Sequence, residues 1–219
     1  SESVGLSDAG SNSTVDWVWV ELRDANSSTT VVAGQSGILQ RDGDIVDAST
    51  GTTLCVAGLP SSFFVAVKHR NHLGAMTAEP TVAAGGTVVV DFTTMGDADL
   101  HDNPSSTYNY DGVEQTTMSG KRALWAGNAN ADGKVKYDGS ANDRIKLAND
   151  VLTFPGNSTS LNLNYDNALG YFQGDVDMNG KAKYDGSQND RIIIQNIVLT
   201  YPLNALILNN FNDLLEQLP

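Results

Sequence analysis

Two stretches in the second half of the chain place oxygen-bearing side chains at alternating positions and then reach a glycine. In chain order these residues are Asn128, Asn130 and Asp132 before Gly133, and Asp175, Asp177 and Asn179 before Gly180. Alternating residues of a tight loop can point inward together, and Ca²⁺ takes about six to eight oxygen ligands at about 2.4 Å. Glycine permits the sharp turn that such a loop needs. The pattern therefore predicts two calcium-binding loops.

These stretches belong to an internal repeat. Residues 127–152 and 174–199 align without a gap at an offset of 47, and 15 of the 26 positions are identical. After the glycine, both copies contain Lys-Tyr-Asp-Gly-Ser-x-Asn-Asp-Arg and then become apolar. A repeated unit indicates one local structure used twice. We therefore prefer two ion-binding loops to the alternative that both stretches are Asx-rich turns in front of helices.

Each loop needs a further carboxylate to surround an ion. The twelfth position of an EF-hand loop holds a bidentate Glu, but both copies have a glycine there. We assign Asp143 and Asp190, which follow at the start of an expected helix, as the closing ligands. Asp138 and Asp185 are competing candidates, although the glycine after each suggests a turn in which Asp bonds its own backbone. Asn142, Asp143, Asn189 and Asp190 could also act as plain helix caps.

The residue after each glycine, Lys134 or Lys181, is expected to offer its backbone carbonyl while its side chain faces solvent. We name residues 128–143 loop one and residues 175–190 loop two. Loop two has three carboxylates among its expected ligands, whereas loop one has Asn at its first two ligand positions. Fewer anions attract a cation more weakly. We therefore expect loop two to bind calcium more tightly.

Charge and composition restrict the possible partners. The chain has 13 Lys and Arg against 26 Asp and Glu, a net charge of −13, so it should not bind nucleic acid or an anionic membrane surface through charge. No apolar run approaches the roughly 18 residues of a membrane span, and we expect the numbering to begin after a removed export signal. Cys55 is the only cysteine, which rules out an intrachain disulfide.

The first half of the chain has the texture of a β-sheet protein. Residues 1–14 are polar and form an expected extended arm. From residue 15 to residue 95, seven short β-type runs alternate with turn residues, which predicts an Ig-like β-sandwich. The expected strands include residues 15–22, 63–69 and 87–94. Trp17 and Trp19 are expected in its core.

The second half is expected to be a separate calcium-binding domain. Residues 96–120 lack strong periodicity and are expected to form a linker or long loop. Residues 121–202 contain the duplicated loop–helix units. Within residues 203–219, apolar side chains recur at helical spacing, which predicts an amphipathic C-terminal helix. The overall prediction is a mainly β fold with α, in which the sandwich is followed by a duplicated module.

Two family resemblances add to these expectations. The duplicated loop–helix unit resembles dockerins, the calcium-stabilised modules that bind cohesins. The stretches Val65–Gly74 and Leu124–Asn128, together with both Lys-Tyr-Asp-Gly-Ser-x-Asn-Asp-Arg strings, resemble the C-terminal regions of exported, hemagglutinin-like surface proteins of the Bacteroidota. This similarity spans residues 15–200. It implies a secreted, calcium-loaded bacterial protein at the cell surface or outside the cell.

The sequence contains no recognisable catalytic motif. It has no metalloprotease helix motif, no nucleophile elbow and no phosphate-binding glycine loop. His69 and His72 are three residues apart and could touch a metal, but we prefer a polar turn at the end of a strand. The organised carboxylates are explained by the two loops. We therefore expect a protein that is not an enzyme and whose cofactor is calcium, with two ions bound.

The polar arm suggests how copies of the chain could associate. Residues 1–14 have no core of their own, and addition to an exposed sheet edge of a neighbouring copy would hold them. Repeated head to tail, this contact gives an open filament. We therefore expect a self-assembling extracellular filament or surface-layer subunit. The alternatives are a monomeric adhesin or carbohydrate-binding module that recognises glycans or cell-surface proteins, and a dockerin-like docking module of a larger exported protein.

Overall fold

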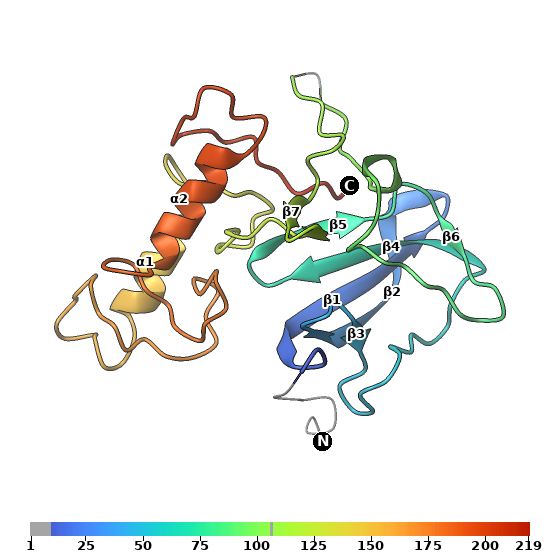
Figure 1. Ribbon diagram of the computed structural model, residues 1–219, viewed down its shortest axis with the longest axis horizontal. Helices are drawn as coiled ribbons and strands as arrows, with labels where there is room; N and C mark the ends of the chain where they lie inside the picture. The colour runs from blue at the N-terminus through green and yellow to red at the C-terminus, as the bar shows by residue number, and fades with distance from the viewer. Residues whose placement is uncertain (1–9, 106) are drawn as a thin grey trace. The chain divides into compact units, whose positions relative to one another are not determined.

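The computed structural model describes residues 10–105 and 107–219. Within them the protein is mainly β, with antiparallel sheets and two α-helices, which confirms the predicted class. The chain forms two compact units (Figure 1). Unit 1 comprises the residues up to His69, Gly74–Leu124 and Gln217–Pro219, and unit 2 comprises Arg70–Leu73 and Trp125–Glu216. None of the helices in the described ranges has the length and apolar character needed to cross a membrane.

Six strands form the main sheet. They are β1 (Thr14–Asp24), β2 (Ser27–Gln40), β3 (Ile45–Val46), β4 (Ser62–His69), β5 (His72–Met76) and β6 (Thr81–Val82). The order is β3-β2-β1-β4-β5, and β6 pairs with β4. Strand β1 pairs antiparallel with β2 on one side and with β4 on the other. It is therefore the central strand of the sheet.

The alternation along β1 decides which of its side chains are buried. Val18, Val20 and Leu22 are buried in the core of unit 1, because successive side chains of a strand point to opposite faces. Trp17 and Trp19 belong to the other face, and Trp19 is 42% exposed. Its ring lies over Gly34, where an added Cβ would come within 2.5 Å of the ring. The expectation that both tryptophans lie in the core is therefore wrong for Trp19.

The segment after β6 covers the core without joining the sheet. Val88, Val90 and Phe92 pack against the core cluster, while Val89 is 89% exposed. This alternation matches the predicted strand over residues 87–94, but the structure assigns no strand to these residues. Among the described residues, the segment forms only one β-bridge, the local one between Ala84 and Thr87. Apolar alternation is thus satisfied by an extended segment that lacks a ladder of backbone hydrogen bonds.

Residues 96–120, expected as a linker, lie inside unit 1. They include a short 3₁₀-helix (Asp97–Asp99) and β7 (Thr116–Met118), which pairs with β8 (Lys121–Ala123). The turn between these two strands has positive φ at both Ser119 and Gly120, as a tight two-residue hairpin turn requires. The border between the units therefore falls after Leu124, later than the predicted linker.

Two helices carry the repeat in unit 2. Helix α1 spans Asp143–Leu152 and helix α2 spans Asp190–Thr200. Each begins at the repeated Asp, as predicted, and each buries an apolar pair one turn apart. The buried pairs are Leu147 and Val151 in α1, and Ile194 and Val198 in α2. The duplication in sequence is therefore a duplication of loop–helix structure.

The predicted helix over residues 203–219 is wrong. Turns and extended chain occupy these residues. Asn204 accounts for the start, because its amide donates to the carbonyls of Val198 and Leu208 and its oxygen accepts from the Leu208 amide, which competes with helical bonding. Further along, Leu215 forms a β-bridge with Lys134. The helical spacing of the leucines therefore does not lead to a helix here.

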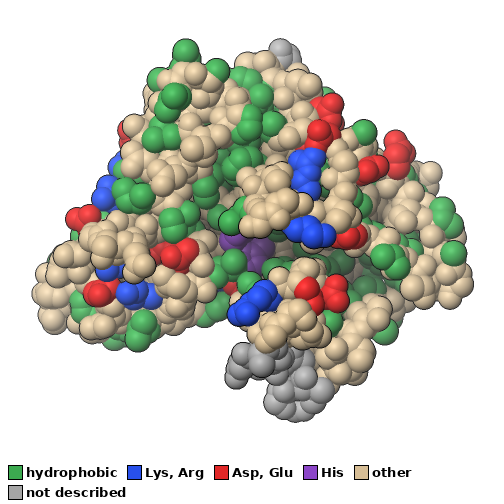
Figure 2. Space-filling view, in the orientation of Figure 1, with side chains coloured by type: hydrophobic (Ala, Val, Ile, Leu, Met, Phe, Trp, Pro, Cys, Tyr) green, Lys and Arg blue, Asp and Glu red, His purple; other side chains and the backbone are tan. Residues whose placement is uncertain are grey.

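One part of this segment is exposed although it is apolar. Leu206 and Ile207 are 78% and 67% exposed, and Ile207 has φ +55°. Figure 2 shows apolar side chains on the surface where Figure 1 draws this loop. Phe211 and Leu214, further along the chain, are buried.

The first nine residues of the predicted arm lie outside the described residues. The part that is described, residues 10–13, bonds to its own chain. The carbonyl of Ser13 accepts from the Arg41 amide at 2.9 Å, and the carbonyl of Ser11 accepts from the Asp42 amide at 3.1 Å. This end of the arm is therefore fixed on the turn that follows β2.

Candidate metal centre

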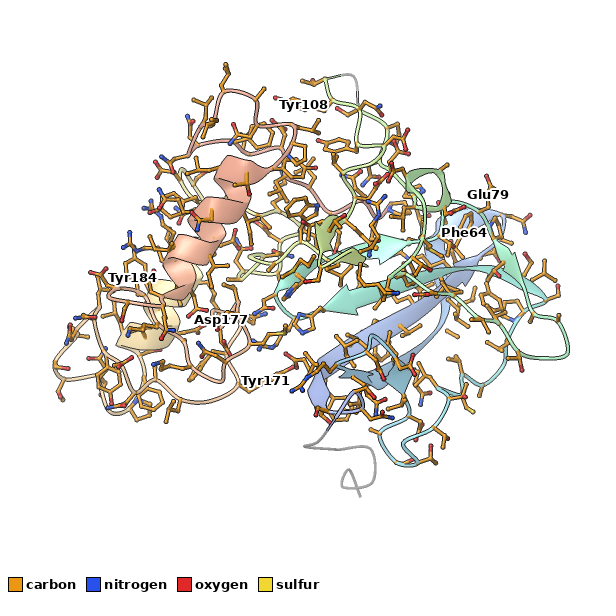
Figure 3. All side chains as sticks on the ribbon, in the orientation of Figure 1. Phe64, Glu79, Tyr108, Tyr171, Asp177 and Tyr184 are labelled. Atoms are coloured by element: carbon orange, nitrogen blue, oxygen red, sulfur yellow. The ribbon has the colours of Figure 1, made fainter. Side chains whose placement is uncertain are left out.

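Loop two brings three carboxylates together in unit 2. Ligand oxygens of Asp175, Asp177 and Asp190 all lie within 4.8 Å of one another. Asp175 and Asp190 are buried, and Asp177 is exposed. Figure 3 labels Asp177, which lies beside the first turn of α2. All three are among the predicted ligands, and the structure places them in one cluster.

The backbone of loop two wraps around the carboxylates. Oδ1 of Asp175 accepts from the Asn179 amide at 3.0 Å, and Oδ2 accepts from the Gly180 amide at 3.0 Å. Oδ1 of Asp177 also accepts from the Asn179 amide, at 3.1 Å. Met178 and Gly180 have positive φ, +57° and +82°, and these values close the turn. The glycine is therefore needed at the position where the sequence pattern has it.

Asp190 closes loop two from the start of α2. Its Oδ1 accepts from the Val176 amide at 2.8 Å, and its Oδ2 accepts from the Lys183 amide at 2.8 Å. It therefore bonds to the start and to the middle of the loop. The helix cap is the preceding Asn189, whose side chain accepts from the Ile192 amide. Asp190 consequently has a position that capping does not explain.

Asp185, the competing candidate, lies elsewhere. Its side chain is 56% exposed and pairs with Arg191 at 3.1 Å. In loop one, Asp138 is similarly 54% exposed and pairs with Arg144 at 2.8 Å. The structure therefore favours Asp190, and by the repeat Asp143, as the closing carboxylates.

Loop one repeats this geometry with fewer charges. Oδ1 of Asp143 accepts from the Asn130 amide at 3.1 Å, and Oδ2 accepts from the Lys136 amide at 2.7 Å. The Asp132 amide donates to Oδ1 of Asn128 at 3.0 Å and to Oδ1 of Asn130 at 3.1 Å. The structure thus brings the predicted side-chain ligands of loop one around one turn. Loop one has Asn128 and Asn130 where loop two has Asp175 and Asp177, and Asp132 where loop two has Asn179, so it has one carboxylate fewer.

The two lysines after the glycines lie in short β-bridges. Lys134 is opposite Leu215, and Lys181 is opposite Leu169. The flanking hydrogen bonds run from Val135 N to Leu214 O, from Glu216 N to Gly133 O, from Gly170 N to Gly180 O and from Ala182 N to Ala168 O. Because ladder bonds alternate along a strand, the lysine carbonyls are not used in these bridges. Their role as ligands stays a prediction. The Lys181 ammonium pairs with Asp166 at 2.7 Å.

Burial changes the acidity of the closing carboxylates. Loss of solvent raises the pKa of Asp143 and of Asp190 from the usual 3.8 to about 7. Neighbouring carboxylates add to this effect, Asp132 in loop one and Asp177 in loop two. Burial also raises the pKa of Asp175. Protein donors alone therefore do not fully compensate these negative charges, and a cation in the loop would do so.

The donor set fits a hard divalent cation. The clustered side chains offer oxygen atoms, which suit Ca²⁺ and Mg²⁺ rather than soft metals. The two histidines considered as metal ligands contact other side chains: Nε2 of His69 lies 3.0 Å from Oδ2 of Asp16, and Nδ1 of His72 lies 2.8 Å from Oδ1 of Asn71. The polar-turn interpretation of these histidines is therefore the better one.

Sequence reasoning missed two groups of residues that shape unit 2. Asn157 and Asn204 are buried after α1 and α2, each bonded to a helix carbonyl. Arg70 and Asn71 both contact loop two at Asp175. Asn157 and Asn204 are 47 positions apart, as is the repeat, so extending the alignment could have found them. Nothing in the local sequence connects Arg70 or Asn71 with the loop.

Comparisons with known proteins add no relative. The chain matches no protein-family model, no curated protein and no solved structure.

Proposed function

We propose that this chain is a non-enzymatic calcium-binding structural protein whose two loops each hold one ion. The observation that carries the proposal is the convergence of Asp175, Asp177 and Asp190 oxygens within 4.8 Å, in a loop whose backbone repeats in a second copy. Carboxylates this close repel one another, and burial together with the neighbouring Asp177 raises the pKa of Asp190 to about 7. A divalent ion supplies that charge and ties the loop to α2.

The resemblance to dockerins supplies the finer description of the fold. We describe unit 2 as a dockerin-like pair of loop–helix units, supported by α1 and α2 starting at equivalent Asp residues. We describe unit 1 as an Ig-like sandwich in which residues 88–92 stand in for part of the second layer. The inward packing of Val88, Val90 and Phe92 supports this description.

Calcium binding outside the cell would give the loops their structural role. The ion binds the folded loop and so stabilises it by mass action, and extracellular calcium is abundant enough to load sites of ordinary affinity. We therefore place the protein at the bacterial cell surface or in the extracellular space. There the loaded loops keep unit 2 rigid.

The calcium proposal is tested by removing single carboxylates. Asp190→Ala should abolish calcium binding at loop two and leave binding at loop one, and Asp132→Ala should do the reverse. Calorimetric calcium titration measures both variants. Asp185→Ala is the matched control, because it removes an equally charged but exposed side chain that pairs with Arg191. Equal binding by all three variants and the unchanged chain would refute the proposal.

Self-assembly into a filament or surface layer is the second part of the proposal. Strand β3 pairs only with Ile38 and Leu39 of β2 within the described chain, so the outer edge of β2 before them is left without a strand. Val31 and Val32 on this stretch are 49% and 43% exposed, and the run from Ser27 to Gln35 has no charged residue. Such an edge accepts an added strand from another copy.

Negative-stain microscopy of the full chain with calcium tests this assembly. Polymers are expected, and Val31→Lys should reduce them because a charged edge opposes strand addition. Val89→Lys is the control, since Val89 is exposed but lies off the sheet. Monodisperse particles at high protein concentration would contradict assembly while leaving calcium binding intact.

Trp19 favours a second candidate function, that of an adhesive module. The residue is 42% exposed on the face of the sheet away from the core, and exposed aromatic rings can stack on sugars. Glycan-array binding that Trp19→Ala abolishes would establish this candidate, and an empty array would remove it.

A further inference from the structure

Arg70 places a fixed positive charge beside a carboxylate of loop two. Its Nη2 lies 3.6 Å from Oδ2 of Asp175, and the two side chains are 11% and 2% exposed. The guanidinium stacks over Tyr171, 4.3 Å from the ring centroid, and donates to the Phe172 carbonyl. These contacts hold the charge in one place. Because the pair is shielded from solvent, salt screens it far less than a surface pair.

This contact changes the charge balance between the loops. Loop two has three ligand carboxylates, and with Arg70 the formal sum is −3 + 1 = −2. Among its expected ligands, loop one has the carboxylates of Asp132 and Asp143, which also give −2. We infer that Arg70 is a built-in counter-ion that neutralises one of the three carboxylates of loop two, Asp175, and so lowers the affinity of this loop for a divalent ion. This inference rests on the proposed calcium function.

Two opposite effects follow from such a counter-ion. Without an ion, Arg70 relieves the repulsion among three carboxylates whose oxygens lie within 4.8 Å of one another. With an ion, the guanidinium and the metal are both close to Asp175 and repel each other. A unit charge about 7 Å from a divalent ion in a watery medium changes the affinity by roughly tenfold. Arg70 is therefore a positioning and affinity-setting residue, not a ligand.

Asn71 holds the backbone independently of this charge. It is fully buried, and its Nδ2 donates to the Asp175 carbonyl at 2.7 Å and to the Gln173 carbonyl at 3.0 Å. Its own carbonyl accepts from the Gly127 amide at 2.9 Å. Removing the Arg70 charge therefore leaves these attachments of loop two in place. A charge effect can then be separated from a loss of structure.

The test is calcium titration in an Asp132→Ala background, where loop two is the remaining site. Arg70→Gln keeps an amide donor for Phe172 but removes the charge, and it should tighten calcium binding by roughly tenfold. Arg70→Lys keeps the charge and should bind as the parent does. Arg144→Gln is the matched control: Arg144 also stacks on a tyrosine, Tyr137, but pairs with Asp138 outside the cluster. Its removal should leave the affinity of loop two unchanged.

The outcomes separate this inference from the calcium proposal. If the parent binds calcium and Arg70→Gln binds equally or more weakly, the counter-ion role is wrong and calcium binding stands. If the unchanged chain binds no calcium, the proposed function fails first. Should Arg70→Gln not fold, the salt dependence of the Asp132→Ala and Asp190→Ala variants decides. If added salt lowers the calcium affinities of the two variants to the same extent, the two loops carry equal net charge and the inference is supported. A steeper fall for loop two, measured in Asp132→Ala, overturns the inference.

Discussion

At the scale of single residues, Asp143 and Asp190 have the most consequential positions. Each accepts backbone amides from two sides of its loop, and each is buried at a helix start. These bonds favour the ionised form, yet burial outweighs them and raises both pKa values. A bound cation would therefore stabilise the ionised form of these two side chains more than that of the exposed carboxylates around them.

These pKa values predict how stability depends on pH. Without calcium, both carboxyls change from a pKa of 3.8 in the unfolded chain to about 7 in the folded chain. The folded state then binds more protons, so this contribution to stability is present below about pH 4 and is lost as pH rises through about 7. Thermal unfolding in EDTA should give a Tm that falls over this range.

Calcium should reverse that trend, because it binds the ionised carboxylates. The Tm in excess calcium should rise over the same pH range in which the Tm in EDTA falls. The double variant Asp143→Asn, Asp190→Asn is the control. Its Tm should change much less with pH, both in EDTA and in calcium. Parallel pH curves with and without calcium would count against loops of this kind.

Asn128 offers a way to strengthen loop one. Its Oδ1 accepts from the Asp132 amide, and a carboxylate of the same shape can accept that bond. Asn128→Asp gives loop one the residue that loop two has in Asp175, and calcium affinity should rise by roughly tenfold. Titration in an Asp190→Ala background measures the change. Asn209→Asp, which adds the same charge away from the loops, should leave the affinity unchanged, and an equal gain there would point to net charge alone.

At the scale of elements, local pattern predicted some features and failed on others. The repeat located both loops, and the Asp after Asn142 and Asn189 marked the starts of both helices. The C-terminal leucines also recur at helical spacing but form no helix. Asn204 and the segment at Lys134 form hydrogen bonds with the backbone there instead. Spacing reports which side chains are buried, and it does not report which backbone groups are already bonded.

Contacts between distant segments could not be read from the sequence. The counter-ion Arg70 approaches Asp175 from the turn between β4 and β5, so a count of charges within loop two overstates its net charge. For the same reason, residues 87–94 alternate as a strand does but find no partner strand in the described chain. Pairing depends on the rest of the fold, whereas alternation is local.

The buried asparagines after the helices make an element-scale prediction. Asn204 satisfies the Val198 and Leu208 carbonyls and the Leu208 amide. Asn204→Ala leaves these groups without that partner, and the free energy of unfolding should fall by about 2–3 kcal/mol. Asn209→Ala is the control, because Asn209 is exposed and its hydrogen bond to Gln195 lies at the surface, and it should change stability by less than about 0.5 kcal/mol. Chemical denaturation with calcium present would measure both, and equal small losses would contradict a structural role for Asn204.

At the scale of the whole molecule, charge and ion binding are connected. The chain carries a net charge of −13, and self-repulsion at such a charge opposes the compact state. Every predicted ligand lies in unit 2, so the two proposed calcium ions would offset four units of negative charge at the loops. Unit 1 carries the sheet and its open β2 edge instead. Ion loading and self-association are therefore assigned to different parts of the chain.

The number of calcium ions held per chain is the most direct measure of the central claim. Native mass spectrometry of the full chain in calcium should show two ions bound, and one ion in Asp132→Ala or in Asp190→Ala. EDTA should remove both ions and lower the Tm. A chain that holds no calcium, with the same Tm in calcium and in EDTA, would contradict the assignment of these loops as metal sites.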